Sequence, residues 1–448
     1  MIEAADRRSG LERFLSVFTE VRAGEAATLL MLTLNIFLIL TAYYIVKPVR
    51  EALILAVPQG AEIKSYAAAG QALLLLGAIP VYSWLASRVP RRRLINVVTI
   101  FFAGCLALFY ALIVAGAPVA IVFFLWVGIF NLMVPAQFWA FANDVYTPEA
   151  GKRLFVIVAF GASTGAVFGS WIAGQLIGAL GVSQLLLVSG AILLSSLVLT
   201  NLVDGREGAA AAAGPGKEPE QEPLGRTGAF RLLMRSRYLL LIAFLMLVLN
   251  WVNTTGEYIL GRAVREAAIA AAADSAGVEE FIGAFYARFF TIVNIVGLLL
   301  QLFVVSRILK YFGVRLAICV LPVIAMGGYL VAAFYPVLAI IRTVKIAENA
   351  TDYSLQNTVR QALFLPTTRE EKYKAKQAID TFFVRSGDVL SAVTVFVGTA
   401  VFTLSIQQFA MINIVLVSAW LSLAVLIARE HRRRVPADAA GMGAPAAS

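Results

Sequence analysis

Apolar runs, each near the length of about 20 residues that a bilayer-spanning helix needs, recur about twelve times along this chain. Hydrophobic residues make up 60% of the sequence and charged residues only 14%, against about 25% in an ordinary soluble domain. A water-soluble fold cannot bury so many apolar runs, whereas lipid solvates them directly. The runs therefore predict an all-α polytopic membrane protein with about twelve transmembrane helices.

A change in composition divides these runs into two groups. The stretch that begins at Asp204, DGREGAAAAAGPGKEPEQEPLGRTG, is rich in Ala, Gly, Pro and Glu and cannot bury a core. We expect two pseudo-symmetric six-helix halves of the major-facilitator type, in which substrate binds near the midplane between the halves. The predicted organisation is an amphipathic cytoplasmic segment (1–24), an N-terminal half (25–203), a cytoplasmic linker (204–236), a C-terminal half (237–430) and a cytoplasmic tail (431–448).

A repeated phrase supports the two halves. YIVKPVREA begins at Tyr44, and YILGRAVREA begins at Tyr258, 214 residues later. Cys105 and Cys319, each inside an apolar run, are also 214 residues apart. Chance similarity between helices of low complexity is the alternative, but several matches keep nearly one offset. The phrase therefore indicates a duplicated bundle whose two copies each end their first helix with a basic–acidic pair.

The formal net charge of +10 is explained by topology rather than by nucleic-acid binding. Lys and Arg gather in alternate loops, such as SRVPRRRL, TPEAGKRL and TTREEKYKAKQ, whereas most of the opposite loops are short and nearly uncharged. Cytoplasmic loops of membrane proteins carry this excess of basic residues. We expect a multi-pass protein of the cell (inner) membrane with both termini in the cytoplasm, and no signal peptide.

Several chemistries find no support in the residues. The two cysteines suggest no disulfide framework, and the one histidine, His431, lies in the basic C-terminal tail. A histidine-based triad or a multi-histidine metal site is therefore excluded, and no nucleophile–base constellation is recognisable. We predict no enzymatic activity, no metal and no cofactor. Gly161, Gly165 and Gly169, at four-residue spacing, predict close helix packing and not a phosphate-binding loop.

Charged side chains inside the apolar runs mark the candidate site, because ionisable groups in a span are costly and usually face a cavity or a partner. Cations and an amide predicted to bind substrate are Lys47, Arg50, Arg288, Arg342, Lys345, Asn349 and Arg385. Residues predicted to gate or to form ion pairs are Glu51, Glu257, Glu348, Asp352, Lys376, Asp380 and Asp388. Guanidinium and ammonium groups suit phosphate or carboxylate oxygens. Purely structural ion pairs between the two sets are the alternative for each residue.

Three stretches resemble the ATP/ADP translocases, the nucleotide transporters of plastids and intracellular bacteria. In YIVKPVREAL, Lys47, Arg50 and Glu51 occupy the positions of that family's first-helix pattern. FWAFANDVYTPEAGKRLF (138–155) resembles the family's fourth-helix exit, and the segment 352–380 resembles its stretch between helices ten and eleven. The sequence departs from the family's charged pattern at Val127, Asn253, Asp352 and Asp388. The resemblance implies a divergent transporter of this superfamily and fold.

These observations lead to one main hypothesis and two alternatives. The first is a monomeric secondary transporter that moves a nucleotide or a related phosphorylated or anionic metabolite by alternating access, with exchange as one mode. The second is a proton-coupled transporter of another solute, with Asp352 or Glu348 as the proton carrier. The third is a membrane partner protein that retains the fold without transport. The partners we expect are the anionic solute and the bilayer, and not nucleic acid.

Overall fold

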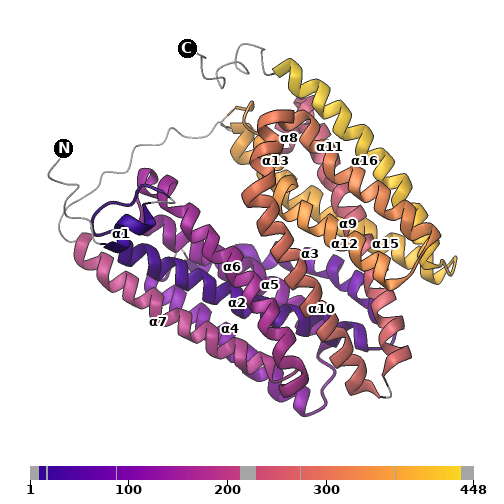
Figure 1. Ribbon diagram of the computed structural model, residues 1–448, viewed down its shortest axis with the longest axis horizontal. Coiled ribbons are helices and arrows are strands. Elements are labelled where there is room, and N and C mark those ends of the chain that lie inside the picture. Colours follow the sequence, from indigo (N-terminus) through magenta and orange to yellow (C-terminus); the bar gives the residue numbers. More distant parts are fainter. Residues whose placement is uncertain are drawn as a thin grey trace. The chain divides into compact units, whose positions relative to one another are not determined.

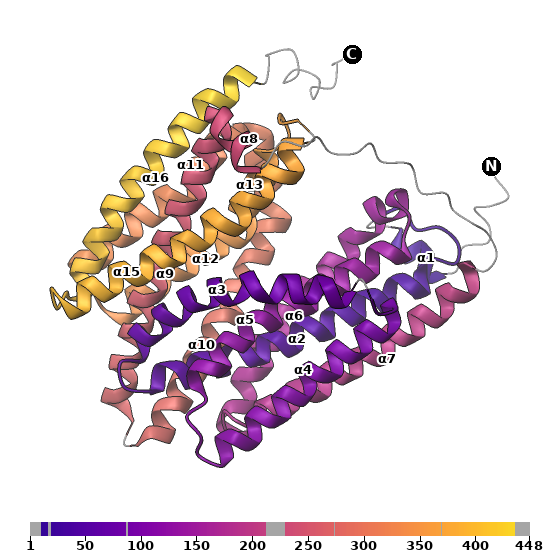
Figure 2. The same cartoon turned by 180° about the vertical axis from the view of Figure 1, so that it is seen from behind.

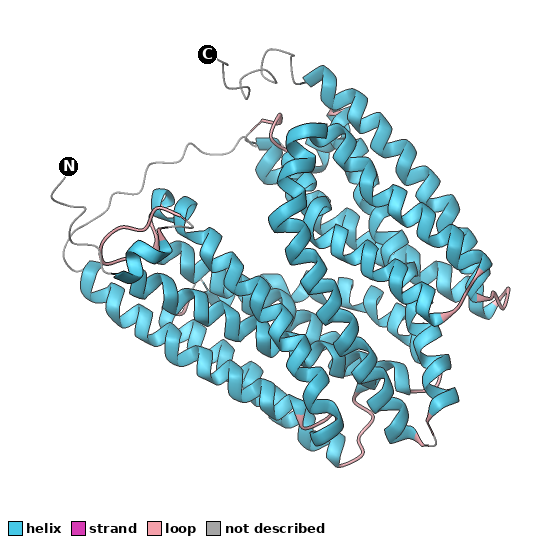
Figure 3. Cartoon of the chain, in the orientation of Figure 1, coloured by secondary structure: helices cyan, strands magenta, loops and turns pink. Residues whose placement is uncertain are grey.

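The computed structural model describes residues 10–16, 19–86, 88–211, 229–272, 274–368 and 370–434. Within these residues the chain forms helices and loops and contains no strand (Figure 3). Helices satisfy every backbone hydrogen bond within one segment, which is the requirement that lipid imposes on a spanning chain. The all-α class predicted from the apolar runs is therefore confirmed.

The helices follow one another along the chain as coloured in Figure 1. The first group is α1 (Gly10–Leu15), α2 (Ala26–Ala56), α3 (Gly60–Ala86), α4 (Arg91–Val114), α5 (Ala120–Val145), α6 (Pro148–Leu180) and α7 (Leu185–Ala211). The second group begins with α8 (Ala229–Arg235), α9 (Arg237–Ala271), α10 (Ser275–Leu299), the π-helical turn η2 (Leu300–Val304) and α11 (Val305–Phe334). It continues with α12 (Leu338–Thr351), η3 (Asp352–Gln356), α13 (Asn357–Ala362), η4 (Glu371–Ala375), α14 (Lys376–Ala378), η5 (Ile379–Phe383), α15 (Val384–Ala400) and α16 (Ile406–Arg434).

Nine stretches of the described chain are long and apolar enough to cross a membrane. One of them, Ser275–Phe334, has 60 residues and is long enough for two crossings, about 20 residues each. Gly313 interrupts it with a φ of +67°, a left-handed conformation that glycine adopts without strain. Two further helical segments, α3 and the run from α12 to α13, lie outside the nine. Together they agree with the predicted number of about twelve spans.

The chain folds as two compact units, and each contains a piece of the other half's sequence. Unit 1 holds α1, α2, α4 to α7, the part of α3 from Leu73 and the part of α10 up to Asn294. Unit 2 holds Gln59–Ala72 of α3, α8, α9 and the chain from Ile295 to α16. Figure 2 shows α3 from behind, with the helices of both groups labelled. Two ionisable residues near the start of α3, Glu62 and Lys64, therefore belong to unit 2.

Glycines hold α6 close to α2 in unit 1, as their four-residue spacing predicts. A Cβ atom on Gly161 would lie 2.7 Å from the backbone oxygen of Thr33, and one on Gly169 would lie 2.5 Å from that of Thr41. Contacts this short are not tolerated, so only glycine permits the two backbones to approach. This close approach of the two backbones confirms the prediction that the glycines serve helix packing.

The same helix pair recurs in unit 2 between α9 and α15. A Cβ atom on Gly387 would lie 2.7 Å from the backbone oxygen of Leu247. Leu247 follows Thr33 by 214 positions, and Gly387 follows Gly161 by 226 positions. The close approach of α6 to α2 thus has a counterpart at the offsets of the sequence repeat.

A hydrogen bond repeats at the same offsets. The hydroxyl of Thr41 donates to the backbone oxygen of Gly165 at 3.3 Å, and both residues lie where α2 meets α6. In unit 2 the hydroxyls of Thr255 and Ser391 lie 2.9 Å apart, and both side chains are buried. Thr255 again follows Thr41 by 214 positions, and Ser391 follows Gly165 by 226. Matching packing and hydrogen bonding indicate that the two copies fold alike.

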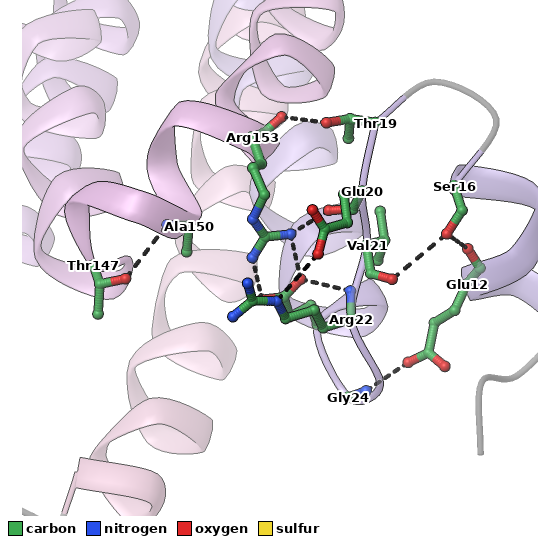
Figure 4. Close-up of polar contacts among 11 residues, drawn as sticks. Glu12, Ser16, Thr19, Glu20, Val21, Arg22, Gly24, Thr147, Ala150 and Arg153 are labelled. Atoms are coloured by element: carbon green, nitrogen blue, oxygen red, sulfur yellow. Dashed lines mark hydrogen bonds and ion pairs between the residues drawn. The ribbon is translucent and has the colours of Figure 1, made fainter. Parts of the chain in front are cut away.

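The segment that precedes α2 is held against the start of α6 (Figure 4). The guanidinium of Arg153 forms an ion pair with Glu25 at 2.9 Å, and the hydroxyl of Thr19 donates to the backbone oxygen of Arg153 at 2.9 Å. Glu12 in α1 accepts a hydrogen bond of 2.6 Å from the backbone of Gly24. The start of α6 itself is capped by Thr147, whose side chain accepts from Ala150. Part of the predicted amphipathic segment is thus tied to the first half.

Helix extends into the predicted linker and into a basic stretch of the second half. The basic stretch SRILKYFGVRL lies in α11, which continues through it with a break at Gly313. At the predicted linker, α7 extends to Ala211 and α8 covers Ala229–Arg235, while residues 212–228 lie outside the described chain. Charged side chains that follow an apolar run can continue its helix, so a charged stretch is not always a loop.

Candidate functional site

A buried lysine stands at the centre of the polar residues in unit 2. Lys345 lies on α12 and is 1% exposed. Its Nζ atom lies 3.0 Å from Oδ1 of Asn253, 3.2 Å from Oε2 of Glu348 and 3.5 Å from Oε1 of Glu257. Two of these partners lie on α9, so the lysine joins α12 to α9. An ammonium group removed from water needs such oxygen partners to remain charged.

The network around Lys345 extends to two more helices. Oε2 of Glu257 lies 3.7 Å from Nζ of Lys64, in the part of α3 that belongs to unit 2. The amide of Asn349 donates to Glu257 at 3.1 Å, and the hydroxyl of Tyr329 donates to Glu348 at 3.0 Å. The two lysines and two glutamates balance one another in charge. We call Lys64, Glu257, Lys345 and Glu348 the four-charge network.

A glycine makes room for this network on α9. A Cβ atom on Gly256 would lie 3.1 Å from Nζ of Lys345 and would collide with the hydroxyl of Tyr329. Any larger residue would push the lysine or the tyrosine out of place. The sequence thus positions the charged groups through a missing side chain as well as through those present.

A second ion pair lies on α15 and accepts hydrogen bonds from α9. Asp388 accepts hydrogen bonds from the amide of Asn250 at 2.7 Å and from the hydroxyl of Thr254 at 2.8 Å. Arg385 lies one turn earlier, with Nη1 3.3 Å from the other carboxylate oxygen of Asp388. Asp388 is only 7% exposed, and these three donors stabilise its carboxylate in that buried position.

Beside these groups lies a polar cavity of about 320 Å³ within unit 2. It is lined by Met246, Leu249, Asn250, Asn253, Asp352, Tyr353, Gln356, Asn357, Arg360 and Val384. Four of its charged or amide side chains come from the turn η3 and from α13, namely Asp352, Gln356, Asn357 and Arg360. A π-helical turn within a spanning helix is a common feature of functional sites. We call this space the η3 cavity.

Unit 1 carries a separate cationic pair on α2. Lys47 is 8% exposed, and its Nζ lies 4.0 Å from the ring centroid of Phe290 and 5.1 Å from that of Tyr44. Arg50 forms an ion pair with the adjacent Glu51 and lies 4.7 Å from the ring centroid of Phe124. Aromatic faces stabilise cations in a poorly hydrated setting.

The remaining predicted residues occupy different surroundings. Arg288 is exposed in unit 1 and lines a hollow of about 510 Å³ with Trp171, Gln175 and Thr291. Arg342 is exposed, although it lies one turn before the buried Lys345. Lys376 donates to Gln361 at 2.6 Å, and Oδ1 of Asp380 is buried without a hydrogen bond among the described residues. Of the seven predicted binding residues, Lys345, Asn349 and Arg385 thus lie in or beside the network of unit 2.

Sequence reasoning missed one member of the four-charge network, Lys64, and the tyrosine that donates to it, Tyr329. Lys64 lies in an apolar helix near Glu62, which accepts from the hydroxyl of Tyr258 at 3.1 Å. The signal was a lone lysine inside a span, which is as costly as those on α12. Tyr329 gave no signal, because a tyrosine in an apolar helix is ordinary until its hydroxyl is seen to meet a buried carboxylate.

Comparison with known proteins finds a family and a relative. The sequence profile of the TLC ATP/ADP transporter family matches residues 5–125. The chain is 25% identical over 299 residues to ADP,ATP carrier protein 1 of Chlamydia pneumoniae, a similarity that covers 57% of this chain and 56% of the carrier. The chain thus spans little more than half the length of the curated relative that it matches.

Solved structures share the fold at low identity. The nucleoside transporter NupG has a TM-score of 0.63 at 12% identity, covering 90% of this chain and 99% of that one. A bacterial homologue of the iron transporter ferroportin, in the inward-facing state, has a TM-score of 0.64 at 12% identity, covering 90% and 98%. These likenesses confirm the major-facilitator-type fold. By sequence, residues 5–125 are similar to the TLC ATP/ADP transporter family, and little more than half of the chain is similar to the chlamydial carrier.

Proposed function

We propose that the protein is a secondary carrier, not an enzyme, that exchanges nucleotides across a membrane by alternating access. The observation that carries this proposal is the four-charge network, in which the ammonium of Lys345 is held by Glu257 and Glu348 within 3.5 Å. The relative's name, ADP,ATP carrier protein 1, supports the same class of substrate. The proposal treats the predicted halves, residues 25–203 and 237–430, as the bodies that move.

Phosphate oxygens act on this network by competition. Without substrate, Lys345 is neutralised by carboxylates of its own chain, so the buried charges cost little. A phosphoryl group that approaches Lys345 offers stronger, multiply charged acceptors, and Glu348 and Glu257 then keep their other donors, Tyr329 and Lys64. Exchange of partners couples binding to rearrangement of the helices that carry them. Within unit 1, Lys47 and Arg50 are further cations that suit phosphate oxygens.

The multi-pass arrangement also bears on location. The protein spans a membrane several times. We further propose the inner membrane with both termini in the cytoplasm, because the basic loops alternate with nearly uncharged ones. The working unit that we propose is a monomer. The linker and the tail then face the compartment that supplies one of the exchanged nucleotides.

Proton-coupled transport of another solute is the second candidate. It is favoured by Asp352, whose carboxylic acid lines the η3 cavity. A carboxyl group in such a position binds and releases a proton as its surroundings change. Under this candidate the solute gradient follows the pH gradient and not an opposing nucleotide.

The experiment is counterflow in proteoliposomes that contain the purified chain. Vesicles loaded with ADP should take up labelled ATP from outside, and empty vesicles should not. The variant Lys345→Ala should lose this exchange, whereas Lys310→Ala, a change at an exposed lysine of α11, should retain it. Uptake that is independent of internal nucleotide but driven by an acidic exterior would favour the proton-coupled carrier. No uptake of any nucleotide under either condition would favour a protein that retains the fold without transport.

A further inference from the structure

One buried amide in the η3 cavity has no partner. Gln356 is 2% exposed, and neither its side-chain nitrogen nor its side-chain oxygen makes a hydrogen bond among the described residues. The Nε atom of Arg360, one turn later, is also buried without a partner there. A buried polar group left unsatisfied is costly and rare, so each case requires an explanation. Both groups line the same cavity, which suggests that they await a ligand.

Two more amides line this cavity in fixed orientations. Oδ1 of Asn253 accepts from Lys345 at 3.0 Å, which leaves its Nδ2 as a free donor within the described structure. Nδ2 of Asn250 donates to Val384 and Asp388, each at 2.7 Å, which leaves its oxygen as a free acceptor there. With Gln356, the wall therefore presents both donors and acceptors.

The charges of the cavity argue against a phosphate as its occupant. Asp352 and Arg360 contribute one negative and one positive charge, and the other polar lining groups are neutral amides or a phenol. A phosphoryl group here would meet the carboxylate of Asp352, whereas Lys345, the cation proposed to attract phosphate, does not line this cavity. A neutral, flat group with alternating donors and acceptors suits the lining better. A volume of about 320 Å³ lies at the lower end of ligand pockets, large enough for part of a nucleotide only.

We propose that the η3 cavity binds the base of the nucleotide and that Gln356 reads its hydrogen-bonding edge, with adenine preferred. This assignment rests on the proposed nucleotide exchange and adds the base specificity to it. An amide pairs with adenine by two hydrogen bonds, accepting from the 6-amino group and donating to the adjacent ring nitrogen. Adenine offers this donor–acceptor pair on both of its edges. The base then lies beside Asn253, which is hydrogen-bonded to Lys345 of the four-charge network.

The test measures which part of the nucleotide each variant recognises. Isothermal titration of the purified chain in detergent would use ADP, GDP and pyrophosphate. We expect tighter binding of ADP than of GDP. Gln356→Leu should weaken ADP by about 5- to 150-fold, the range of one bidentate amide–base pair, and leave pyrophosphate unchanged. Gln356→Glu, which only accepts hydrogen bonds, should invert the preference towards GDP, whose ring N–H and amino groups donate side by side.

The matched control is Gln408→Glu, which adds the same charge to the same unit outside the cavity. Gln408 lies at the start of α16, where its side chain accepts from the backbone of Ser405 at 2.8 Å, and a glutamate keeps this contact. This variant should bind ADP and GDP like the parent chain. Base selectivity that is unchanged in both Gln356 variants, with normal thermal unfolding, would overturn the base assignment and leave the carrier proposal intact. A parent chain that binds neither ADP nor pyrophosphate would overturn both.

Discussion

Nζ of Lys345 lies 3.2 Å from Oε2 of Glu348, one helical turn further along the spanning segment, and the two side chains are only 2% and 3% exposed. A pair in this position has lost its water and depends on the geometry of its partners. Glu348 also accepts from Tyr329 on α11, and Lys345 also contacts Glu257 on α9. One ion pair thus connects three helices of unit 2.

Removing the cation alone should destabilise the protein. Lys345→Ala leaves Glu348 buried opposite only the hydroxyl of Tyr329, and we expect a loss of about 3–5 kcal/mol in the free energy of unfolding. The double variant Lys345→Met with Glu348→Gln removes both charges and should lose much less. Thermal unfolding in detergent measures both, and nucleotide exchange should be absent in each. A single variant as stable as the double would contradict the buried-pair interpretation.

The first copy of the repeated phrase should matter more for transport than the second. Lys47→Ala or Arg50→Ala should abolish nucleotide uptake into proteoliposomes with the protein still folded, because the substrate would lose a cation in a poorly hydrated site. Arg265→Ala, at the half-exposed counterpart in α9, should reduce uptake only mildly. Uptake that survives both first-copy substitutions would favour purely structural roles for Lys47 and Arg50.

Helix packing in unit 1 should be sensitive to a single methyl group. Gly169→Ala places a Cβ atom 2.5 Å from the backbone oxygen of Thr41 and should cost about 1–3 kcal/mol, the usual penalty of overpacking. Gly104→Ala is the control, since a Cβ atom there meets no atom within 4 Å. Comparing the midpoints of thermal unfolding of the two variants tests the prediction. Equal midpoints for the two variants would contradict the role of Gly169 in the close packing of α6 against α2.

The attachment of the N-terminal segment should depend on pH. Burial raises the pKa of Glu25, but hydrogen bonds from the side chain of Arg153 and the backbone of Arg22 outweigh it, so the pKa lies below its ordinary value of 4.5. Because the folded-state pKa of Glu25 is lowered, its ionised carboxylate stabilises the attachment fully above pH 4.5. This contribution is lost as the pH falls through the folded-state pKa.

Amide hydrogen exchange, corrected for the intrinsic effect of pH, should therefore show residues 19–25 protected at neutral pH and less protected in acid. Arg153→Ala should reduce the protection at neutral pH, whereas Arg93→Ala, at an exposed arginine of α4, should not. Protection that is the same in acid and at neutral pH would contradict a role for the Glu25 carboxylate.

The orientation in the membrane can be tested through the predicted linker. A cysteine introduced at Gly216, which lies outside the described residues, should not react with an impermeant thiol reagent added to intact cells. The reason is the excess of Lys and Arg on the loops of that side. Reaction after permeabilisation serves as the positive control, and labelling of intact cells would reverse the predicted topology.

The sequence by itself determined the class of the protein, because the length and apolarity of a spanning run are local properties. It predicted the all-α membrane fold with about twelve spans, the duplicated bundle and the packing role of Gly161, Gly165 and Gly169. Each of these depends on spacing along one helix or on a repeat that can be read directly from the residues.

Only the tertiary structure decided which charged residues share a site. Arg342 and Lys345 lie one turn apart on α12, yet one is exposed and the other is the centre of the four-charge network. Lys64 joins that network from α3 by pairing with Glu257 on α9, a helix much later in the chain. Gln356 is notable only because its surroundings leave it without a hydrogen bond. Partners, burial and unsatisfied groups depend on how distant helices pack, and no periodicity within a single helix records that.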